Sequence, residues 1–304
     1  MATDNAVKEL INRMSGNSDV ITKRYFDSLV IEQRIIGSDL ADMHMDFFGE
    51  KLPMPIMMGA IGAFHHLGEN ALLKSAEAAR ELGTVLWTTS HLNNDELKEV
   101  VDTGVKTAFI VKPFKDQQFF LQRLIEGEKA GVKVLACDID HAYKNGEYDV
   151  QREFMFGPKS VEDLKEVKKN TSIPFIAKGV LSVHDALKCR EAGVDGIILS
   201  HHHNIYPSAV PPLMVLPEIR KAVGDDYPVF VDCGITSGTE AFKALSLGAS
   251  GVLVARGYMT PLAKEGKEGV VRYIRQLASE TRELMNRTSS SDIRHIDPGV
   301  IHKL

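Results

Sequence analysis

The sequence predicts an α/β protein built as a single (β/α)8 barrel, and three observations support this prediction. Short apolar runs that end in a polar group alternate with segments of helical spacing along most of the chain. Most of these helical segments close on glycine, a common residue at the C-terminus of a helix. The length of 304 residues fits one such barrel with short additions.

Eight apolar runs are the predicted strands of the barrel. They occupy residues 55–62, 84–90, 107–112, 134–140, 174–179, 196–202, 228–234 and 251–256. Segments with the 3.6-residue spacing of a helix follow most of them. Eight units favour a closed TIM barrel over an open doubly wound sheet, the second candidate, because an open sheet rarely needs eight regular repeats.

The segments outside the repeats are predicted to be additions to this barrel. Residues 1–50 hold two polar helices, near 6–14 and 22–34, and carry too little apolar sequence for a core of their own. We therefore expect an N-terminal helical cap. The barrel itself is predicted to span residues 51–287 and to end in a long C-terminal helix, and residues 288–304 form a polar tail.

Composition and charge indicate a cytoplasmic protein that binds neither nucleic acid nor membrane. The formal net charge is -5, and the charged residues of both signs are mixed, so no basic face is expected. The chain starts without a signal-peptide pattern, and no apolar run reaches the ~18 residues of a membrane span. Cys137, Cys189 and Cys233 lack a pairing pattern, so we expect reduced thiols, with Cys137 and Cys233 acting as small buried hydrophobes.

Polar side chains end several predicted strands, and the active site of a barrel lies at that edge. The run 134–140 ends in Asp138 and Asp140, the next predicted strand in Lys178, and the one after it in Ser200 and His202. Since side chains alternate between the two faces of a strand, these groups are predicted to share the barrel mouth. Burying such a set is costly unless the groups pair or meet a ligand.

The remaining histidines are interpreted as structural. His201 and His203 point away from the face of His202 and are expected to be packing or loop residues. Four further histidines follow strand ends and, together with the aspartates, leave a metal-dependent hydrolase as an alternative: His65, His66, His91 and His141. No HxH motif ends the first strand, and we expect no metal in the site.

The loops after the seventh and eighth strands are predicted to hold a phosphate group. They read DCGITSGTE and VARGYMT. Glycines there allow the backbone to come close to an anion, and Arg256 adds positive charge. These two loops form the usual phosphate site of a barrel, so we expect a ligand that bears phosphate.

Three segments of the sequence resemble a known protein family. The segments PIMMGAIGAFHHLGENALLKSAEAARELGT, PFIAKGVLSVHDALKCREAGVDGIILSHH and AVPPLMVLPEIRKAVGDDYPVFVDCGITSGTEAFKALSLGASGVLVAR resemble the FMN-dependent α-hydroxy-acid dehydrogenase and oxidase family, which includes glycolate oxidase, lactate oxidase and flavocytochrome lactate dehydrogenase. The likeness runs from about residue 25 to 285 and is densest from 172 to 275.

The resemblance implies three catalytic residues. The flavin lysine of the family's VKG motif matches Lys178, and a fixed ammonium there would stabilise the charge of a reduced flavin. The catalytic histidine of the SNHG motif matches His202. The aspartate that orients this histidine matches Asp140, which would raise the basicity of the imidazole.

The resemblance also implies FMN as the cofactor. The phosphate-end motif DGG-hydrophobic-R-R-G-T matches residues 232–239, so its first arginine is replaced by Thr236, while the later arginine is kept as Arg256. The implied FMN-binding residues are Ala60, Thr89, Asp138, Lys178, Ser200, Asp232, Gly234, Ala255 and Arg256.

Departures from the family pattern fall on the substrate side. Of the two family arginines that bind the substrate carboxylate, one is replaced by Ile205, and the other, in the loop after strand four, aligns near Glu147. A tyrosine that helps to hold the substrate is replaced by Lys112, and its neighbouring flavin-contacting glutamine by Ile110. The threonine that touches the flavin becomes Asp138. We expect Lys112, together with His202, to bind the substrate, although an ammonium lacks the planar fork of arginine.

The sequence therefore predicts an FMN-dependent oxidoreductase that oxidises a 2-hydroxy acid or a related small hydroxy compound. His202 would remove a proton while the substrate carbon gives a hydride to the flavin. The alternatives are an FMN-dependent isomerase without net redox change, the metal-dependent hydrolase and a non-catalytic flavin-binding protein. The electron acceptor is not predicted, and a homo-oligomer is expected by analogy with the family.

Overall fold

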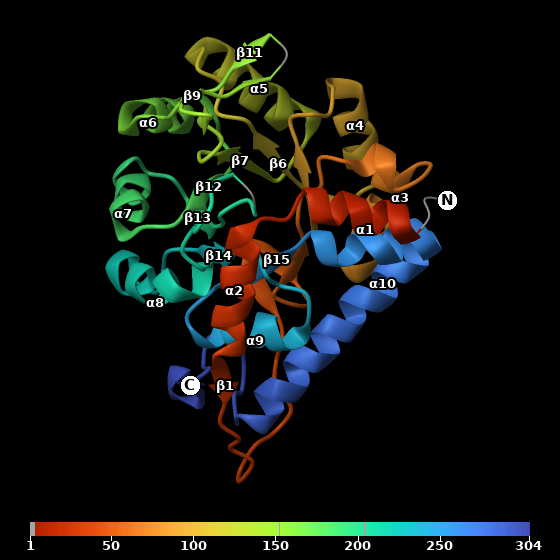
Figure 1. Ribbon diagram of the computed structural model, residues 1–304, viewed down its shortest axis with the longest axis vertical. Helices are drawn as coiled ribbons and strands as arrows, with labels where there is room; N and C mark the ends of the chain where they lie inside the picture. The colour runs from red at the N-terminus through yellow and green to blue at the C-terminus, as the bar shows by residue number, and fades with distance from the viewer. Residues whose placement is uncertain (1–3, 152, 204) are drawn as a thin grey trace.

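A closed parallel barrel forms the centre of the computed structural model, which describes residues 4–151, 153–203 and 205–304 (Figure 1). Its strands, in order around the barrel, are β4 (Ile56–Met58), β5 (Val85–Thr89), β6 (Lys106–Val111), β7 (Val134–Asp138), β12 (Phe175–Val180), β13 (Gly196–Leu199), β14 (Val229–Val231) and β15 (Gly251–Val254). All neighbouring pairs are parallel, and β15 closes on β4. The predicted TIM barrel is therefore confirmed.

Helices surround the barrel and connect its strands (Figure 1). They are α3 (Ala71–Leu82), α4 (Asn94–Asp102), α5 (Gln117–Ala130), α6 (Val161–Asn170), α7 (Val183–Glu191), α8 (Pro212–Val223), α9 (Gly238–Ser246) and α10 (Arg256–Arg287). The backbone of α10 is non-helical at Gly266, where φ is 61°, so α10 is two helical segments joined at a kink. Its second segment corresponds to the predicted long C-terminal helix.

Alternate residues of the strands fill the barrel, as strand geometry requires. Trp87, Ala136, Ile176, Ile198 and Phe230 belong to one buried apolar cluster inside it. Residues of opposite parity pack outwards against the helices in a second, larger cluster. The inward face therefore carries an apolar core along its length, and charged groups enter only where strands end.

A β-hairpin that the sequence did not predict closes the end of the barrel where the strands begin. It consists of β2 (Met45–Phe47) and β3 (Glu50–Leu52). The Phe47 ring packs inside the barrel, with its centroid 5.6 Å from that of Phe230 and 6.1 Å from that of Trp87. This end is filled by apolar side chains, and the polar chemistry lies at the opposite end.

The second predicted helix ends earlier than the spacing indicated. Helices α1 (Asp4–Arg13) and α2 (Asn17–Asp27) form the N-terminal cap, but residues 29–31 form strand β1 (Leu29–Ile31). Strand β1 pairs antiparallel with β16 (Ile301–Lys303) in the C-terminal tail. Local spacing cannot show a partner that lies more than 270 residues away, as His302 does from Val30.

Helix α2 lies against the mouth of the barrel (Figure 1). The hydroxyl of Thr22 is 2.8 Å from Nε2 of His201, which follows β13. The ammonium of Lys243, on α9, donates to the carbonyl of Phe26 at 2.7 Å. These contacts tie the N-terminal cap to the loops where the predicted site lies.

Short elements complete the chain. After β7 come two small hairpins, β8 (Tyr143–Lys144) with β9 (Glu147–Tyr148), and β10 (Val150–Gln151) with β11 (Phe154–Met155). Single turns of 3-10 helix occur at η1 (Phe64–His66) and η2 (Pro298–Val300). Among the described residues, no helix combines the length and the apolar character needed to cross a membrane.

Candidate active site

Four ionisable side chains meet where β7, β12 and β13 end. The ammonium Nζ of Lys178 is in direct contact with Nε2 of His202. On the other side of the same imidazole, Nδ1 donates to Oδ2 of Asp140 at 2.5 Å. Oδ1 of Asp138 lies 2.9 Å from His202 Nε2 and 3.4 Å from Lys178 Nζ. The structure thus brings together the three residues that the family resemblance implies as catalytic.

Gly179 allows the Asp140 carboxylate to come close to His202. Gly179 has a φ of +98°, and a Cβ atom at this position would lie 2.4 Å from the carboxyl carbon of Asp140. The pairing of β12 with β13 also shifts register between Lys178 and Val180. A side chain at position 179 would therefore push the Asp140 carboxylate away from His202.

A turn, rather than the strand, sets the direction of the His202 side chain. Strand β13 ends at Leu199, and His202 adopts a left-handed φ of 44°. The backbone N–H of His202 donates to the hydroxyl of Ser200 at 3.3 Å. Non-glycine residues in this region of backbone space are uncommon and concentrate at functional sites.

The charges of the cluster set its protonation states against the effect of burial. Burial opposes ionisation of Asp138, but the charges of His202 and the neighbouring lysines hold the pKa of its carboxyl well below the usual range. Burial likewise opposes the charge of Lys178, but the carboxylates around it, led by Asp138, raise the pKa of its ammonium. Burial opposes protonation of His202, but Asp138 and Asp140 raise its pKa to about 9.

Lys112, the predicted substrate cation, is paired within the cluster. Its Nζ donates to Oδ2 of Asp138 at 2.8 Å, and both side chains are buried. The sequence did not indicate this pair, because Lys112 directly follows β6, Asp138 ends the adjacent strand β7, and the two meet only after the sheet forms. A substrate carboxylate would therefore share the Lys112 ammonium with Asp138.

Several buried polar atoms of the cluster have no hydrogen-bond partner. They are Oδ1 of Asp138, Oδ1 of Asp140 and Nε2 of His141. The Asp138 oxygen lies at ion-pair distance from His202 without the alignment of a hydrogen bond. Burial, together with the charges of Lys112 and His202, lowers the pKa of His141, so its imidazole is neutral. A ligand with polar groups would satisfy these atoms.

Ser200 and Asp232 extend the cluster towards β14. Oδ2 of Asp232 lies 3.3 Å from Lys178 Nζ and accepts a hydrogen bond of 3.4 Å from the Ser200 hydroxyl. Ser200 Oγ is also 3.4 Å from Lys178 Nζ. Burial opposes ionisation of Asp232, but the ammonium of Lys178 is the main cause of its lowered pKa.

The predicted residues of the first two strand ends lie at or next to a pocket formed by the loops after β4 and β5. Thr89 lines a pocket of about 410 Å³ together with Gly62, His65 and His91, and Ala60 precedes this loop at the end of β4. A pocket of about 760 Å³ occurs at the opposite end of the barrel, where Phe48 and other residues around the β2–β3 hairpin line it. The ionisable residues of the mouth cluster, such as Lys178 and His202, do not line this larger pocket. We therefore place the site at the mouth of the barrel.

At the predicted phosphate end, Arg256 is already paired with helix α2. Its Nη1 donates to the hydroxyl of Ser15 at 2.6 Å, and its Nη2 donates to Oδ1 of Asp19 at 2.6 Å. Gly234 has a φ of +86°, and a Cβ there would lie 2.9 Å from the methyl group of Thr22. Helix α2 therefore packs directly on the loop that was predicted to surround a phosphate.

Carboxylates of the protein also face the backbone donors of this loop. The N–H of Thr236 lies 3.3 Å from Oε2 of Glu240, and the N–H of Gly238 donates to Oε2 of Glu280 at 2.8 Å. Carboxylates are favoured at the start of a helix because unpaired N–H groups point outwards there. The predicted anion donors at the start of α9 thus have anionic partners from the chain itself.

Three residues that the sequence analysis treated as structural form a second polar cluster beside the first. His201, His203 and Cys233 come together, although the histidines were expected to be packing or loop residues and Cys233 a small hydrophobe. Burial raises the pKa of the Cys233 thiol, but His203 and His201 hold it well below its usual range. Burial opposes protonation of His203, but Cys233 and Asp19 raise its pKa to about 9. The sequence did contain a signal for this cluster, because His203 replaces the glycine of the SNHG motif and Cys233 replaces the first glycine of the DGG motif.

The four histidines that supported the metal-hydrolase alternative do not form one group. Among the described residues, one possible metal-binding group at the mouth contains Asp138, His141 and His202. His65, His66 and His91 belong to neither this group nor the second one.

Comparison with known proteins identifies the family. A model of the FMN-dependent dehydrogenase family matches residues 14–161 and 144–303. The chain is 31% identical to 4-hydroxymandelate oxidase of Amycolatopsis orientalis over 287 residues, which cover 81% of this chain and 79% of that protein. It is 29% identical to glycolate oxidase of Spinacia oleracea over 312 residues, which cover 89% and 84% of the two chains.

Solved structures agree with these relatives. A crystal structure of mandelate oxidase superposes with a TM-score of 0.87 at 25% identity and covers 99% of this chain and 96% of that one. A mandelate oxidase variant that carries an adduct of FMN gives the same TM-score of 0.87, with coverage of 99% and 98%. The family model spans nearly the whole chain, and the chain therefore belongs to the FMN-dependent dehydrogenase family.

Proposed function

We propose that this protein oxidises a 2-hydroxy acid, or a related small hydroxy compound, to the corresponding carbonyl compound with FMN as its cofactor. The observation that carries the proposal is the contact of Lys178 and His202 at the barrel mouth, with Asp140 bound to the far side of the imidazole. The relatives support the substrate class, because their names describe oxidation of glycolate and 4-hydroxymandelate.

The residues at the mouth fit the ring end of FMN. A buried ammonium and several buried polar atoms without partners, on Asp138, Asp140 and His141, offer complementary contacts to a polar ring system. We propose that the ring and ribityl chain are held by Ala60, Thr89, Asp138, Lys178, Ser200 and Asp232. When bound, FMN supplies the two-electron acceptor that side chains cannot provide.

We propose that the phosphate is held by Gly234, Ala255 and Arg256. The Arg256 guanidinium binds Asp19, so a phosphate must replace this carboxylate or share the arginine with it. Such an exchange keeps the charge of Arg256 paired in both states. Movement of Asp19 would loosen the contact of α2 with the mouth.

His202 is the proposed base. Its Nδ1 proton is held by Asp140, which leaves Nε2 directed at the reacting region beside Lys178. An imidazole whose basicity is raised by a carboxylate takes a proton from a hydroxyl more readily. The ammonium of Lys178, itself held by Asp138 and Asp232, offsets negative charge that develops at the mouth.

Lys112 is the proposed partner of the substrate carboxylate. The substrate arginines of the family are absent, since Ile205 and Glu147 occupy those positions. Lys112 pairs with Asp138, but Asp138 also faces Lys178 and His202. The Asp138 carboxylate therefore stays paired with Lys178 and His202 when Lys112 turns towards a substrate.

The alternatives have less support. The named relatives are oxidases, which favours net oxidation over isomerisation without redox change. A hydrolytic metal at Asp138, His141 and His202 would compete with the ion pairs that already hold Asp138 and His202.

We further propose a cytoplasmic homo-oligomer, with an electron acceptor that is still to be assigned. Apolar side chains exposed on one segment near the N-terminus, Ile36 at 101% and Leu40 at 80%, support self-association. Sedimentation of the purified protein tests this, and a monomer at micromolar concentration would contradict it.

The first prediction concerns the base. His202→Asn places a residue that tolerates left-handed backbone at this position, so the protein should fold and bind FMN. Anaerobic reduction of the flavin by a hydroxy acid should slow by about 10²- to 10⁴-fold, because proton removal loses its base. The exposed His184 provides the control, and His184→Ala should reduce at the normal rate. Unchanged reduction in His202→Asn would reject the role of His202.

The second prediction concerns pH. Because His202 must be unprotonated to act, the second-order rate constant for flavin reduction should rise with pH and level off above an apparent pKa of about 9. Asp140→Asn removes a charge that raises this pKa and should move the profile towards the ordinary value of 6.5. Stopped-flow absorbance across a pH series measures both profiles. A shift to higher pH in Asp140→Asn is incompatible with this assignment.

The third prediction concerns substrate binding. Lys112→Met should raise the KM for a hydroxy acid by about 10- to 100-fold, which corresponds to the loss of one charge-assisted contact. The methyl ester of the same acid serves as the control, because it carries no carboxylate charge and should respond little. Equal losses with acid and ester would assign Lys112 to the integrity of the cluster instead of substrate recognition.

A further inference from the structure

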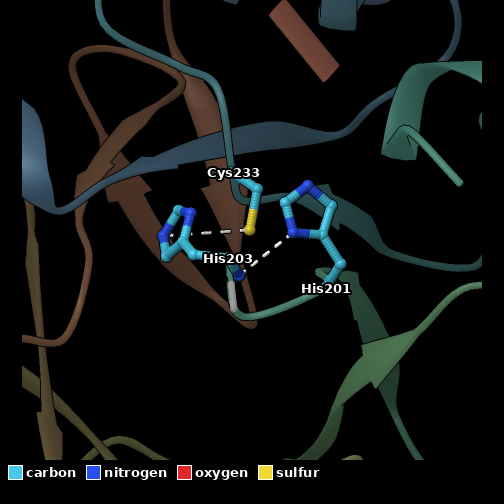
Figure 2. Close-up of side chains that lie close together, drawn as sticks. All are labelled: His201, His203 and Cys233. Carbon is cyan, nitrogen blue, oxygen red and sulfur yellow. Dashed lines mark hydrogen bonds between the residues drawn. The ribbon is translucent and has the colours of Figure 1, made fainter. Parts of the chain in front are cut away.

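The second polar cluster contains three side chains with metal-binding atoms. His201 and His203 follow β13, and Cys233 follows β14. One ligand atom from each residue lies within 4.8 Å of the other two. Figure 2 shows the thiol of Cys233 between the two imidazole rings. The proposed oxidation of a hydroxy acid uses none of these three side chains.

The backbone holds two of these residues in an unfavourable conformation. His203 has a φ of 64° and Cys233 a φ of 69°, in the left-handed region that favours glycine. In the SNHG and DGG motifs that the chain resembles, both positions are glycine. Two replacements of glycine by residues with metal-binding side chains, in loops that face each other, point to a function for the pair.

The outer nitrogen of each ring is already bound by helix α2. Nδ1 of His203 lies 2.6 Å from Oδ1 of Asp19, and Arg256 Nη2 lies 2.6 Å from the same nitrogen. Nε2 of His201 is 2.8 Å from the hydroxyl of Thr22. A carboxylate on the outer nitrogen is a common arrangement around a metal-binding histidine, because it orients the ring and lets the inner nitrogen face the metal. Asp19 provides such a carboxylate at His203, and the Thr22 hydroxyl is in position to accept the Nε2 proton of His201.

The inner atoms are spaced for a metal rather than for a strong hydrogen bond. Sγ of Cys233 is 4.0 Å from Nε2 of His203, and the Ser200 hydroxyl lies 3.3 Å from the same sulfur. A tetrahedral zinc ion, with Zn–S near 2.3 Å and Zn–N near 2.0 Å, separates its sulfur and nitrogen ligands by about 3.5 Å, so Cys233 and His203 would close by about 0.5 Å around the ion. Nδ1 of His201 accepts the backbone N–H of His203 at 3.0 Å, and a metal would replace this hydrogen bond.

We propose that Nδ1 of His201, Nε2 of His203 and Sγ of Cys233 bind one zinc ion, with the fourth coordination position open. One thiolate and two imidazoles are the ligand types that zinc prefers. The ion would link the loops after β13 and β14 and, through Asp19 and Thr22, hold α2 on the barrel mouth. None of the three ligands takes part in the proposed proton removal, although the site borders Ser200 and Arg256 of the proposed FMN site. The test of the metal site does not measure turnover.

The test uses the full chain with its bound FMN, treated with a chelator and then titrated with Co²⁺. We expect one Co²⁺ per chain, intense visible bands of tetrahedral cobalt at wavelengths longer than the flavin absorption, and displacement of these bands by one equivalent of Zn²⁺. X-ray absorption of the zinc form should show one sulfur ligand, with nitrogen or oxygen atoms in the remaining positions and the multiple scattering typical of imidazole. Cobalt that binds without tetrahedral bands, or a zinc shell without sulfur, would overturn the proposal.

Variants locate the site. Cys233→Gly and His203→Gly suit the left-handed backbone, so the metal-free proteins should melt at or above the wild-type temperature while losing the cobalt bands. Cys189→Ala is the control, because Cys189 is a buried thiol on the outer helix α7, and it should keep the bands. If the bands survive in Cys233→Gly, or are lost in His141→Ala, the metal lies at the first cluster and the proposal is wrong.

Discussion

The mouth of this barrel depends on one buried carboxylate, that of Asp138. Its two oxygens face Lys112, Lys178 and His202 within 3.4 Å, so one anion holds two ammonium groups and an imidazole together. Removing one partner from such a group leaves charge buried without compensation, at a cost of about 3–5 kcal/mol. The apolar core explains why the barrel closes, and Asp138 explains why cations can sit at its end.

Helix α2 links the two polar clusters of the mouth. Asp19 binds both Arg256 and His203, and these charges hold the pKa of Asp19 below its usual range despite the opposing effect of burial. Any anion that takes Arg256 from Asp19 therefore also changes the surroundings of His203. The proposed phosphate site, the proposed metal site and the N-terminal cap all share contacts with this single carboxylate.

Much of the fold could be predicted because strand and helix periodicity are local properties of the chain. The eight apolar runs became the eight barrel strands, and the alternation of strand faces is seen inside the barrel, where Ile176 and Ile198 belong to the inner apolar cluster. Local patterns could not show the pairing of β1 with β16 or the hairpin that closes the barrel, since both need distant partners. The same reason explains why the pair of Lys112 with Asp138 was not anticipated.

Strand alternation predicts the direction of a side chain only within a strand, and several residues of the site lie beyond the strand ends. Strand β13 ends at Leu199, so the opposite-face rule applied to His201 and His203 extended past the residues it governs. Left-handed turns redirect His202 and His203, and Cys233 turns in the same way after β14. The second cluster could have been anticipated from His203 and Cys233, because both residues place side chains at positions where the SNHG and DGG motifs have glycine.

The midpoint potential of bound FMN tests the central claim most directly, namely that the buried ammonium of Lys178 acts on the cofactor at the barrel mouth. Lys178→Met removes the charge, and Lys178→Arg retains it. A fixed positive charge beside the flavin would stabilise its reduced, negatively charged form. Lys178→Met should therefore have a more negative potential than the wild type, with Lys178→Arg much closer to it. An unchanged or more positive potential in folded, FMN-bound Lys178→Met would contradict the claim.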